Sequence, residues 1–336
     1  MLKRFLDLSD LADARLEAVL ARARALEQSR VSEALAGKVV GLVFMNPSLR
    51  TLASMQAGVA QLGGSTFAIT PGQSSWRLET RRGAVMDGDA VEHIREAIPV
   101  LAEYADALAI RCFARGVDLA EDMADGVIRA MAELSPVPFI NLESAITHPC
   151  QSLGDWKTLD DLKVPRNGGR FVLAWAWHPK ALPLAVPAST LAMAARRGMQ
   201  VTVLRPDGYA LPAEIMERAG ALAAASGGSV AETANRDAAL DGAHVVYAKS
   251  WASPALYGRP EEANLRAGLR DWCVGEPWFS AAAPDARFMH CLPVRRNVKV
   301  TDEVLDGPRS VVVRQAGNRL HAQKALLIEM LTEEGA

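Results

Sequence analysis

The sequence alternates short apolar runs, typical of buried strands, with longer amphipathic stretches that have a helical period. In the first half, the strand-like runs are KVVGLVF from Lys38, STFAIT over 65–70, ALAIRCF over 107–113 and PFINLE over 138–143. The segments between them are long enough to hold helices, as connections between parallel strands require. The pattern therefore predicts an α/β fold with a parallel sheet covered by helices on both faces.

The same rhythm starts again after His148. Strand-like runs cover 170–177, 200–206, 244–250 and 287–293, and NRLHAQKALLIEMLTEE near the end has a strong helical period. We therefore expect two similar-sized domains, each a parallel sheet flanked by helices, with an active site in the inter-domain crevice. The expected parts are 1–147, 148–316 and a C-terminal helix over 317–336 that packs back across the domain boundary.

Composition limits the class of partner. The chain has 37 Lys and Arg against 39 Asp and Glu, a net charge of −2, so no overall positive field attracts nucleic acid or anionic lipid. No apolar run approaches the roughly 18 residues of a membrane span, and the N-terminal stretch is interrupted by charges. The cysteines are scattered without the spacing of a metal site. We expect a cytoplasmic protein with reduced thiols that binds no membrane, nucleic acid, metal or other cofactor.

The first motif with chemistry is NPSLRT over 46–51, which follows a strand and starts a helix. Ser48 suits the N-cap, and the first turn of a helix exposes backbone N–H groups that bind anions. Hydroxyls of Ser48 and Thr51 with the guanidinium of Arg50 would complete a phosphate cradle. A plain N-cap beside a solvent-facing arginine is the alternative. No glycine-rich nucleotide motif follows any strand, which disfavours P-loop kinases and dinucleotide enzymes.

Polar residues also follow three other strands. Arg111 ends one strand and needs an anionic or carbonyl partner, although an arginine at a frayed strand end is an equal alternative. In THPCQ, His148 can donate to a developing oxyanion and Gln151 can accept from an amide NH2, unless the histidine is structural. HCLP over 290–293 offers Cys291 as a nucleophile, but we prefer a role for backbone carbonyls there. The set suits a phosphate plus a planar carbonyl.

Three of these motifs, S-x-R-T at 48–51, H-P-x-Q at 148–151 and H-C-L-P at 290–293, resemble the aspartate/ornithine carbamoyltransferase family in order and spacing over almost the whole chain. Within the family, the chain is similar to the N-acylornithine branch. The segments that carry this likeness are SSWRLE with Trp76, MDGD over 86–89, YAKSW over 247–251 and RRN over 295–297. Ordinary ornithine enzymes have an aspartate near Lys249 for the free α-ammonium. A lysine there suits the α-carboxylate of a substrate whose α-nitrogen is acylated.

The resemblance implies a role for each matching residue. The phosphate of carbamoyl phosphate would be held by Ser48, Leu49, Arg50, Thr51 and Arg319. Arg111 and His148, with Thr51, would act in catalysis by polarising the carbamoyl oxygen. Gln151 would hold the carbamoyl amide, and Pro149 and Cys150 would also contact carbamoyl phosphate. The carbonyls of Cys291 and Leu292 would contact both substrates, and the acylornithine would be held by Glu143, His178, Lys249 and Arg295. The family also implies a homotrimer in which Trp76 completes a neighbour's carbamoyl phosphate site.

Two residues bear on which acyl group the substrate carries, and they favour different answers. Val91 stands where the acetyl type carries a glutamate and the succinyl type a proline, and a valine cannot repel the extra carboxylate of a succinyl group. Lys299 in NVKVTD instead resembles the acetyl type, where this lysine can be carboxylated. We therefore expect N2-succinyl-L-ornithine as the acceptor, with N2-acetyl-L-ornithine as the alternative.

The implied reaction is transfer of the carbamoyl group to the δ-amine of the N-acylornithine, giving N-acylcitrulline and phosphate in arginine biosynthesis. One rival is a non-catalytic carbamoyltransferase-like protein that only binds ligand. A nicotinamide-dependent oxidoreductase would need a glycine fingerprint that the sequence lacks. Other acceptors such as aspartate or putrescine remain rivals within the family.

Overall fold

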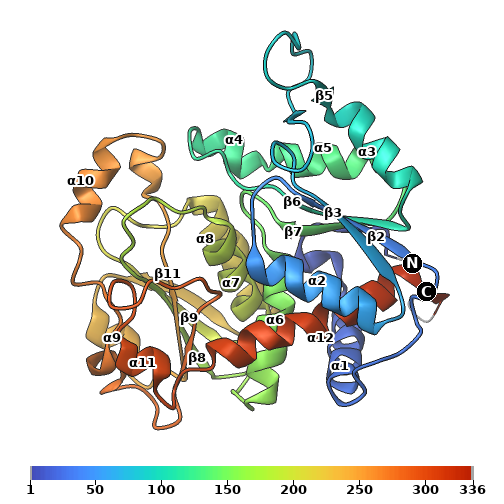
Figure 1. The fold of residues 1–336 in the computed structure, drawn as a ribbon. Coiled ribbons are helices and arrows are strands. Elements are labelled where there is room, and N and C mark those ends of the chain that lie inside the picture. Colours follow the sequence, from blue (N-terminus) through green and yellow to red (C-terminus); the bar gives the residue numbers. More distant parts are fainter. Residues whose placement is uncertain (1, 334–336) are drawn as a thin grey trace. The chain divides into compact units, whose positions relative to one another are not determined.

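The computed structural model describes residues 2–333, and contacts divide the chain into two compact units. Unit 1 comprises Met1–Ala114, Met123–Lys157 and Gly317–Ala336, and unit 2 comprises Arg115–Asp122 and Thr158–Ala316. Each unit contains a parallel sheet with helices packed on it, which confirms the predicted α/β fold class (Figure 1). Residues 1 and 334–336, which belong to the expected first and last parts, lie outside the described residues.

The sheet of unit 1 has five parallel strands in the order β1-β7-β6-β2-β3. Their bounds are β1 (Arg4–Phe5), β2 (Val39–Phe44), β3 (Ser65–Ile69), β6 (Ala107–Arg111) and β7 (Phe139–Glu143). Every residue of β6 and β7 is buried, as expected for near-continuous apolar runs in a parallel sheet. The chain passes from β2 to β3 on one side and returns to place β6 and β7 on the other. The strand order therefore reverses between β2 and β6, where ligands of open α/β sheets bind.

Helices cover both faces of this sheet. Figure 1 shows α3 and α5 over one face and α2 and α12 over the other. Ile98 of α3 and Met131 of α5 pack with Ile110 of β6 and Phe139 of β7 in one buried cluster. The bounds are α1 (Asp13–Gln28), α2 (Leu49–Gln61), α3 (Ile94–Glu103), α5 (Gly126–Leu134), α6 (Pro149–Asp161) and α12 (Val312–Leu331).

A loop with a small two-stranded sheet, β4 (Leu78–Glu79) and β5 (Glu92–His93), precedes α3. The amphipathic stretch that follows β5 is helical from Ile94. The reason is local: the His93 ring accepts the backbone N–H of Arg95 at 3.1 Å, which makes His93 the N-cap.

The sheet of unit 2 also has five parallel strands, in the order β10-β9-β8-β11-β12. Their bounds are β8 (Arg170–Trp175), β9 (Gln200–Leu204), β10 (Ser229–Thr233), β11 (Val245–Lys249) and β12 (Arg287–Met289). The helices are α7 (Ala185–Arg196), α8 (Ala213–Ser226), α9 (Arg236–Leu240), α10 (Glu261–Ala267) and α11 (Asp302–Asp306), with single 3-10 turns over 254–256 and 276–279. The order of strands reverses between β8 and β11, so this sheet has its own ligand-binding edge.

The first unit continues through Lys157, beyond the boundary that we placed after residue 147. The expected boundary after residue 147 lies just before helix α6. Lys157 is fully buried in unit 1, where its ammonium binds Glu27 at 2.5 Å and the Asn318 side-chain oxygen at 3.1 Å. The expected C-terminal helix is α12, whose residues from Gly317 onward belong to unit 1.

A short segment between β6 and α5, Arg115–Asp122, belongs to unit 2. The buried carboxylate of Asp122 holds it by accepting the backbone N–H groups of Arg115 and Gly116, both at 2.8 Å, and the Tyr257 hydroxyl at 2.9 Å. This segment is joined to α5 through α4 (Leu119–Ala124).

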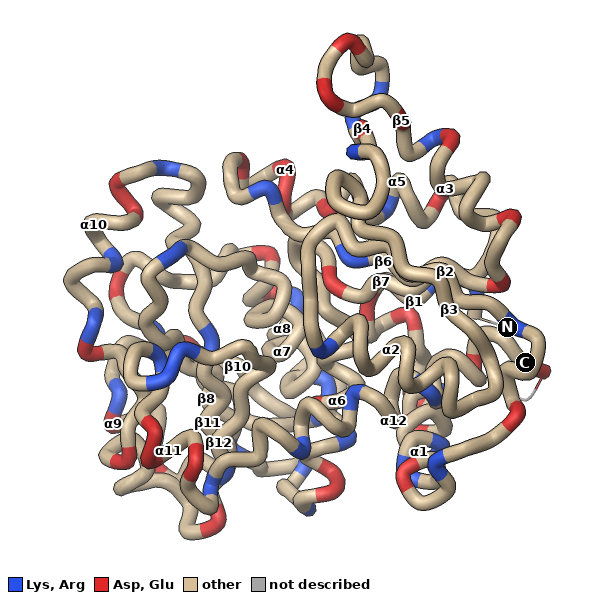
Figure 2. Tube along the Cα trace, in the orientation of Figure 1, with Lys and Arg blue, Asp and Glu red and all other residues tan. Residues whose placement is uncertain are grey.

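Acidic and basic residues alternate along both units without a long stretch of one sign, in keeping with the small net charge (Figure 2). Among the described residues, no helix has the combination of length and apolar character needed to cross a membrane.

Candidate active site

The loop after β2 leads directly into α2, and Ser48 is its N-cap, as predicted. The Ser48 hydroxyl accepts the backbone N–H of Thr51 at 3.4 Å and donates to the Thr51 hydroxyl at 3.0 Å. Thr51 is fully buried, whereas Leu49 is 81% exposed, so only the backbone of Leu49 is suited to an anion. The arrangement places two hydroxyls at the positive end of a helix, next to the strand-order reversal.

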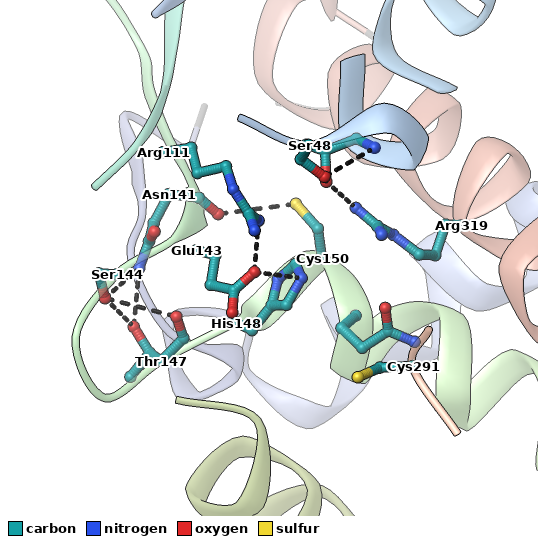
Figure 3. Close-up of polar contacts among 12 residues, drawn as sticks. Ser48, Arg111, Asn141, Glu143, Ser144, Thr147, His148, Cys150, Cys291 and Arg319 are labelled. Carbon is teal, nitrogen blue, oxygen red and sulfur yellow. Dashed lines mark hydrogen bonds and ion pairs between the residues drawn. The ribbon is translucent and has the colours of Figure 1, made fainter. Parts of the chain in front are cut away.

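Three arginines from distant parts of the sequence gather in unit 1 around this helix end. Arg319 of α12 is buried and donates to the Thr51 hydroxyl at 2.7 Å (Figure 3). Burial lowers the pKa of Arg319, and the nearby positive charges of Arg111 and Arg50 lower it further, against the opposing effects of Cys150 and Glu143. Like charges held this close in a buried place favour a bound anion, because an anion offsets their mutual repulsion.

Glu143 connects the two expected oxyanion donors. Arg111 and Glu143 are register partners at the carboxyl ends of neighbouring strands, and the Arg111 guanidinium donates to the Glu143 carboxylate. The same carboxylate oxygen lies 3.2 Å from Nε2 of His148 (Figure 3). All three side chains are buried, and Arg111 also lies 4.2 Å from the ring centroid of Phe113. The predicted donors are therefore together, with one carboxylate between them.

The first turn of α6 carries the rest of the H-P-x-Q motif. The Gln151 amide nitrogen donates to Asp155 at 2.8 Å, while its buried carbonyl oxygen accepts no hydrogen bond from the described residues. That oxygen is able to accept from an amide NH2, as expected. Burial raises the pKa of the Cys150 thiol to about 12, so this cysteine is a neutral thiol packed under the site and not a nucleophile.

Unit 2 gathers three of the four residues expected to hold the acylornithine, His178, Lys249 and Arg295, near the carboxyl edge of its sheet, whereas Glu143 lies in unit 1. Lys249 ends β11, and its ammonium lies 3.6 Å from Sγ of Cys291, which follows β12. His178 follows β8, and its Nε2 accepts from Arg295 at 3.2 Å. Lys299 is 1% exposed and close enough to Lys249 and Arg295 to feel their charges. The basic side chains of Lys249, Arg295 and Lys299 at this edge could bind carboxylate groups.

Burial beside positive charges shifts two of these groups, His178 and Lys299, toward their neutral forms. Burial lowers the pKa of His178 to about 4, and Lys299, Arg295 and Lys249 contribute to the lowering, against a hydrogen bond that His178 Nδ1 donates to the Lys180 carbonyl. His178 is thus a neutral ring that orients Arg295 rather than a cation that attracts a carboxylate. Burial and Lys249 lower the pKa of Lys299 to about 7.

The remaining predicted residues lie on loops. Trp76 and Val91 belong to the loop around β4 and β5 and are 68% and 61% exposed. Leu292 has a φ of 54°, and its N–H binds Nδ1 of His290 at 2.8 Å. No group of three or more metal-binding side chains occurs within residues 2–333.

Sequence reasoning missed a buried polar network beneath His148. It consists of Asn141 in β7 with Ser144 and Thr147 in the following turn (Figure 3), and of Asp125 before α5. One signal was present: Asn141 is a polar residue in the middle of the buried strand FINLE, and buried polar groups need partners.

The chain is thus an α/β protein with two parallel sheets, each with positively charged side chains beside the carboxyl ends of its strands. Residues 3–161 match the carbamoyl-P binding domain, and residues 184–330 the Asp/Orn binding domain, of aspartate/ornithine carbamoyltransferases. The chain belongs to this family, which confirms the family and the enzyme class predicted from the motifs.

Relatives of known name include both acyl types. The chain is 41% identical to the N-acetylornithine carbamoyltransferase of Xanthomonas axonopodis pv. citri, over 99% of this chain and 98% of the relative. It is 34% identical to the N-succinylornithine carbamoyltransferase of Bacteroides thetaiotaomicron, over 95% of each. A crystal structure of acetylornithine transcarbamylase complexed with acetylcitrulline superposes with a TM-score of 0.95 at 40% identity, covering 99% of this chain and all of the other.

Proposed function

We propose that this protein transfers the carbamoyl group of carbamoyl phosphate to the δ-amine of N2-acetyl-L-ornithine, giving N-acetylcitrulline and phosphate. The relative named for the acetyl substrate is more similar to the chain, at 41% identity against 34% for the one named for the succinyl substrate. A related structure holds acetylcitrulline, the product that this reaction would release. These likenesses reverse the order of acceptors that we expected from Val91.

The observation that carries the proposal is the cluster of Arg50, Arg111 and Arg319 around the end of α2. A phosphate dianion would relieve the repulsion among these guanidinium groups. The α2 N-terminus and the hydroxyls of Ser48 and Thr51 would supply further donors. In this arrangement, Gln151 would accept from the carbamoyl NH2 with the oxygen that accepts no hydrogen bond from the described residues.

The reaction needs little covalent help from the protein. The δ-amine nitrogen forms a bond to the carbamoyl carbon, and the bond from that carbon to the phosphate oxygen breaks. Arg111 and His148 would stabilise the negative charge that develops on the carbamoyl oxygen between these steps. The amine proton leaves with the bond change, and the departing phosphate accepts it. Orientation and charge stabilisation therefore supply most of the acceleration.

The cationic edge of unit 2 supports the acceptor half of the proposal. Lys249 would pair with the α-carboxylate of the acylornithine, whose acylated nitrogen carries no charge to repel it. His178 fixes Arg295 through a hydrogen bond, so Arg295 is a further partner for a carboxylate. The proposal requires this set to present the δ-amine to the carbamoyl group bound by the residues of unit 1.

N2-succinyl-L-ornithine is the second candidate, because Val91 carries no charge. A succinyl group adds one carboxylate, which a glutamate at this position would repel and a valine does not. Competition kinetics with both acylornithines decides between them: a larger kcat/KM for the acetyl compound supports the proposal, and a clear preference for the succinyl compound overturns its acyl group.

The test of the whole function is a panel of amine acceptors with carbamoyl phosphate, read as ureido product. The panel contains N2-acetyl-L-ornithine, N2-succinyl-L-ornithine, L-ornithine, aspartate and putrescine. Product with an acylornithine but not with free ornithine supports the proposal. Absence of product with every acceptor would favour a binding protein instead.

Two further features belong to the proposal. Trp76, exposed on its loop, would complete the site of a neighbouring subunit in a homotrimer, so its replacement by alanine should reduce activity more than it reduces stability. Sedimentation measurements would test the trimer.

Lys299 is a candidate for carboxylation because a lysine with a pKa of about 7 is partly a neutral amine near neutral pH, and 13C-labelled bicarbonate would reveal the adduct by NMR.

A further inference from the structure

The turn that carries His148 is held from below by a carboxylate distant in the sequence. Asp125 immediately precedes α5, where an aspartate usually caps the helix with its side chain, but here it makes no such cap. Instead, its two oxygens accept the Ser144 hydroxyl at 2.6 Å and the backbone N–H of Ala145 at 3.0 Å. Asp125 is 5% exposed and has a φ of 52°, so the chain places a charged side chain in a strained backbone conformation inside unit 1.

The other end of the turn is held by Asn141 and the N-terminal segment. The Asn141 amide donates to the hydroxyls of Ser144 at 3.0 Å and Thr147 at 2.7 Å, and the Thr147 hydroxyl donates to the Leu6 carbonyl at 3.0 Å. A backbone hydrogen bond of 2.8 Å from Ser144 to Thr147 closes the turn. His148 follows at once, and its carbonyl accepts from Gln151 and Ser152 at the start of α6.

One assignment of the hydroxyl protons is consistent with these contacts, and in it the Ser144 and Thr147 hydroxyl oxygens, 2.9 Å apart, share no proton. The Ser144 proton goes to Asp125 and the Thr147 proton to Leu6, while Asn141 supplies the donors that both hydroxyl oxygens accept. An ionised carboxylate fits this pattern because it only accepts. An asparagine in place of Asp125 can accept only one of its two hydrogen bonds and would turn a donor toward the other.

We propose that Asp125 is a positioning residue for catalysis, which acts through the 144–147 turn to fix the His148 imidazole against the carbamoyl oxygen. The proposal rests on the function proposed above. Its consequence is that Asp125 contributes to turnover only while His148 is present, because it touches neither substrate. A misplacement of about 1 Å of a catalytic group can cost about 100-fold in rate.

The experiment is a double-mutant cycle with Asp125→Asn and His148→Ala, measured with carbamoyl phosphate and the best acceptor. Asparagine is chosen because it tolerates a positive φ. Asp125→Asn alone should lower kcat by roughly 10- to 100-fold and change both KM values far less. In the His148→Ala background, the same substitution should change kcat by less than about 3-fold, since its effect is already lost.

Asp122→Asn is the matched control. Like Asp125, Asp122 is a buried carboxylate that accepts from the backbone and from a hydroxyl, in its case from two backbone N–H groups and Tyr257. It should lower the melting temperature while its effect on kcat stays equal in both backgrounds. If Asp125→Asn does not fold, Ser144→Ala, which leaves the bond from Ala145 to Asp125, takes its place in the cycle.

Near-normal kcat for these turn variants, or an equal loss with and without His148, would overturn the role of Asp125. Wild-type protein without carbamoyl transfer would instead refute the proposed function, so the two failures are distinguishable.

Discussion

Replacing Arg319 by methionine tests the phosphate site at its most buried cation. Methionine keeps an unbranched side chain of similar length and removes the charge. Thr51 loses the hydrogen bond from Arg319 but keeps the one from Ser48 at 3.0 Å. Removal of the charge also relieves the repulsion from Arg50 and Arg111. We therefore expect the free energy of unfolding without phosphate to change little, since apolar replacement of buried charges is often neutral.

The effect on phosphate binding should be much larger. A hydrogen bond to a charged group is worth about 1.5–3 kcal/mol. Its loss should weaken phosphate binding by about 10- to 150-fold. At a phosphate concentration 100 times the wild-type Kd, wild-type protein gains about 2.7 kcal/mol of stability, and the variant would gain only about 0.3–1.4 kcal/mol. Calorimetric melting with and without phosphate, together with titration calorimetry, measures both quantities.

Arg22→Met is the control for this prediction. Arg22 of α1 lies in the same unit and binds Glu329 of α12 at 2.9 Å, but it does not belong to the arginine cluster. This variant should keep the full response to phosphate. An Arg319→Met protein that phosphate stabilises as strongly as wild type would refute the assignment of the cluster to phosphate.

Four further predictions follow from the site. Cys291→Ala should retain measurable kcat, because no covalent intermediate is needed; complete loss of turnover with intact folding would contradict this. Val91→Glu should raise the ratio of acetyl to succinyl kcat/KM by about tenfold or more, as like charges repel, and competition kinetics measures that ratio. A lysine whose pKa is lower in the folded state than in the unfolded state reduces the free energy of unfolding while it is protonated. For Lys299 the pKa is about 7 in the folded state against 10.5 ordinarily, so this reduction is complete below pH 7 and disappears as the pH rises toward 10.5. Lys299→Met should thus raise the free energy of unfolding at pH 7 but not at pH 10, which denaturant titration would show. Gly154→Ala should lower stability by about 1–3 kcal/mol, because its Cβ would lie 2.9 Å from Cγ of Arg319, and thermal melting checks this.

The main elements could be predicted because their signals are local. The runs that became β2, β6 and β7 are mostly apolar, and the capping serine before α2 lies directly at the end of the turn. β10 was missed because SVAET is an edge strand with polar, partly exposed residues, so it lacks an apolar run. The segment just after residue 147, where we expected the second domain to begin, gives a similarly weak local signal. It contains charged residues, but the structure buries several of them, such as Lys157, in helix α6.

Within the site, single residues could be predicted and their partners could not. Sequence motifs identified Arg111, Glu143 and His148, but not that one carboxylate oxygen of Glu143 contacts both of the others. The role of Asp125 depends on a partner 19 positions away, which no local pattern indicates. The charge state of His178 likewise depends on Lys249, Lys299 and Arg295, which other loops and strands bring to it.

The position of Arg319 near the end of the chain has a consequence for synthesis of the protein on the ribosome. The ribosome makes most of unit 1 first, then nearly all of unit 2, and only afterwards the part of α12 that carries Arg319. A nascent chain can therefore complete the sheet of unit 1 long before Arg319, part of the proposed phosphate site, has been synthesised. A partly synthesised chain that lacks Arg319 would therefore bind phosphate more weakly. The proposed site in unit 1 would be complete only when the last helix, α12, has been made.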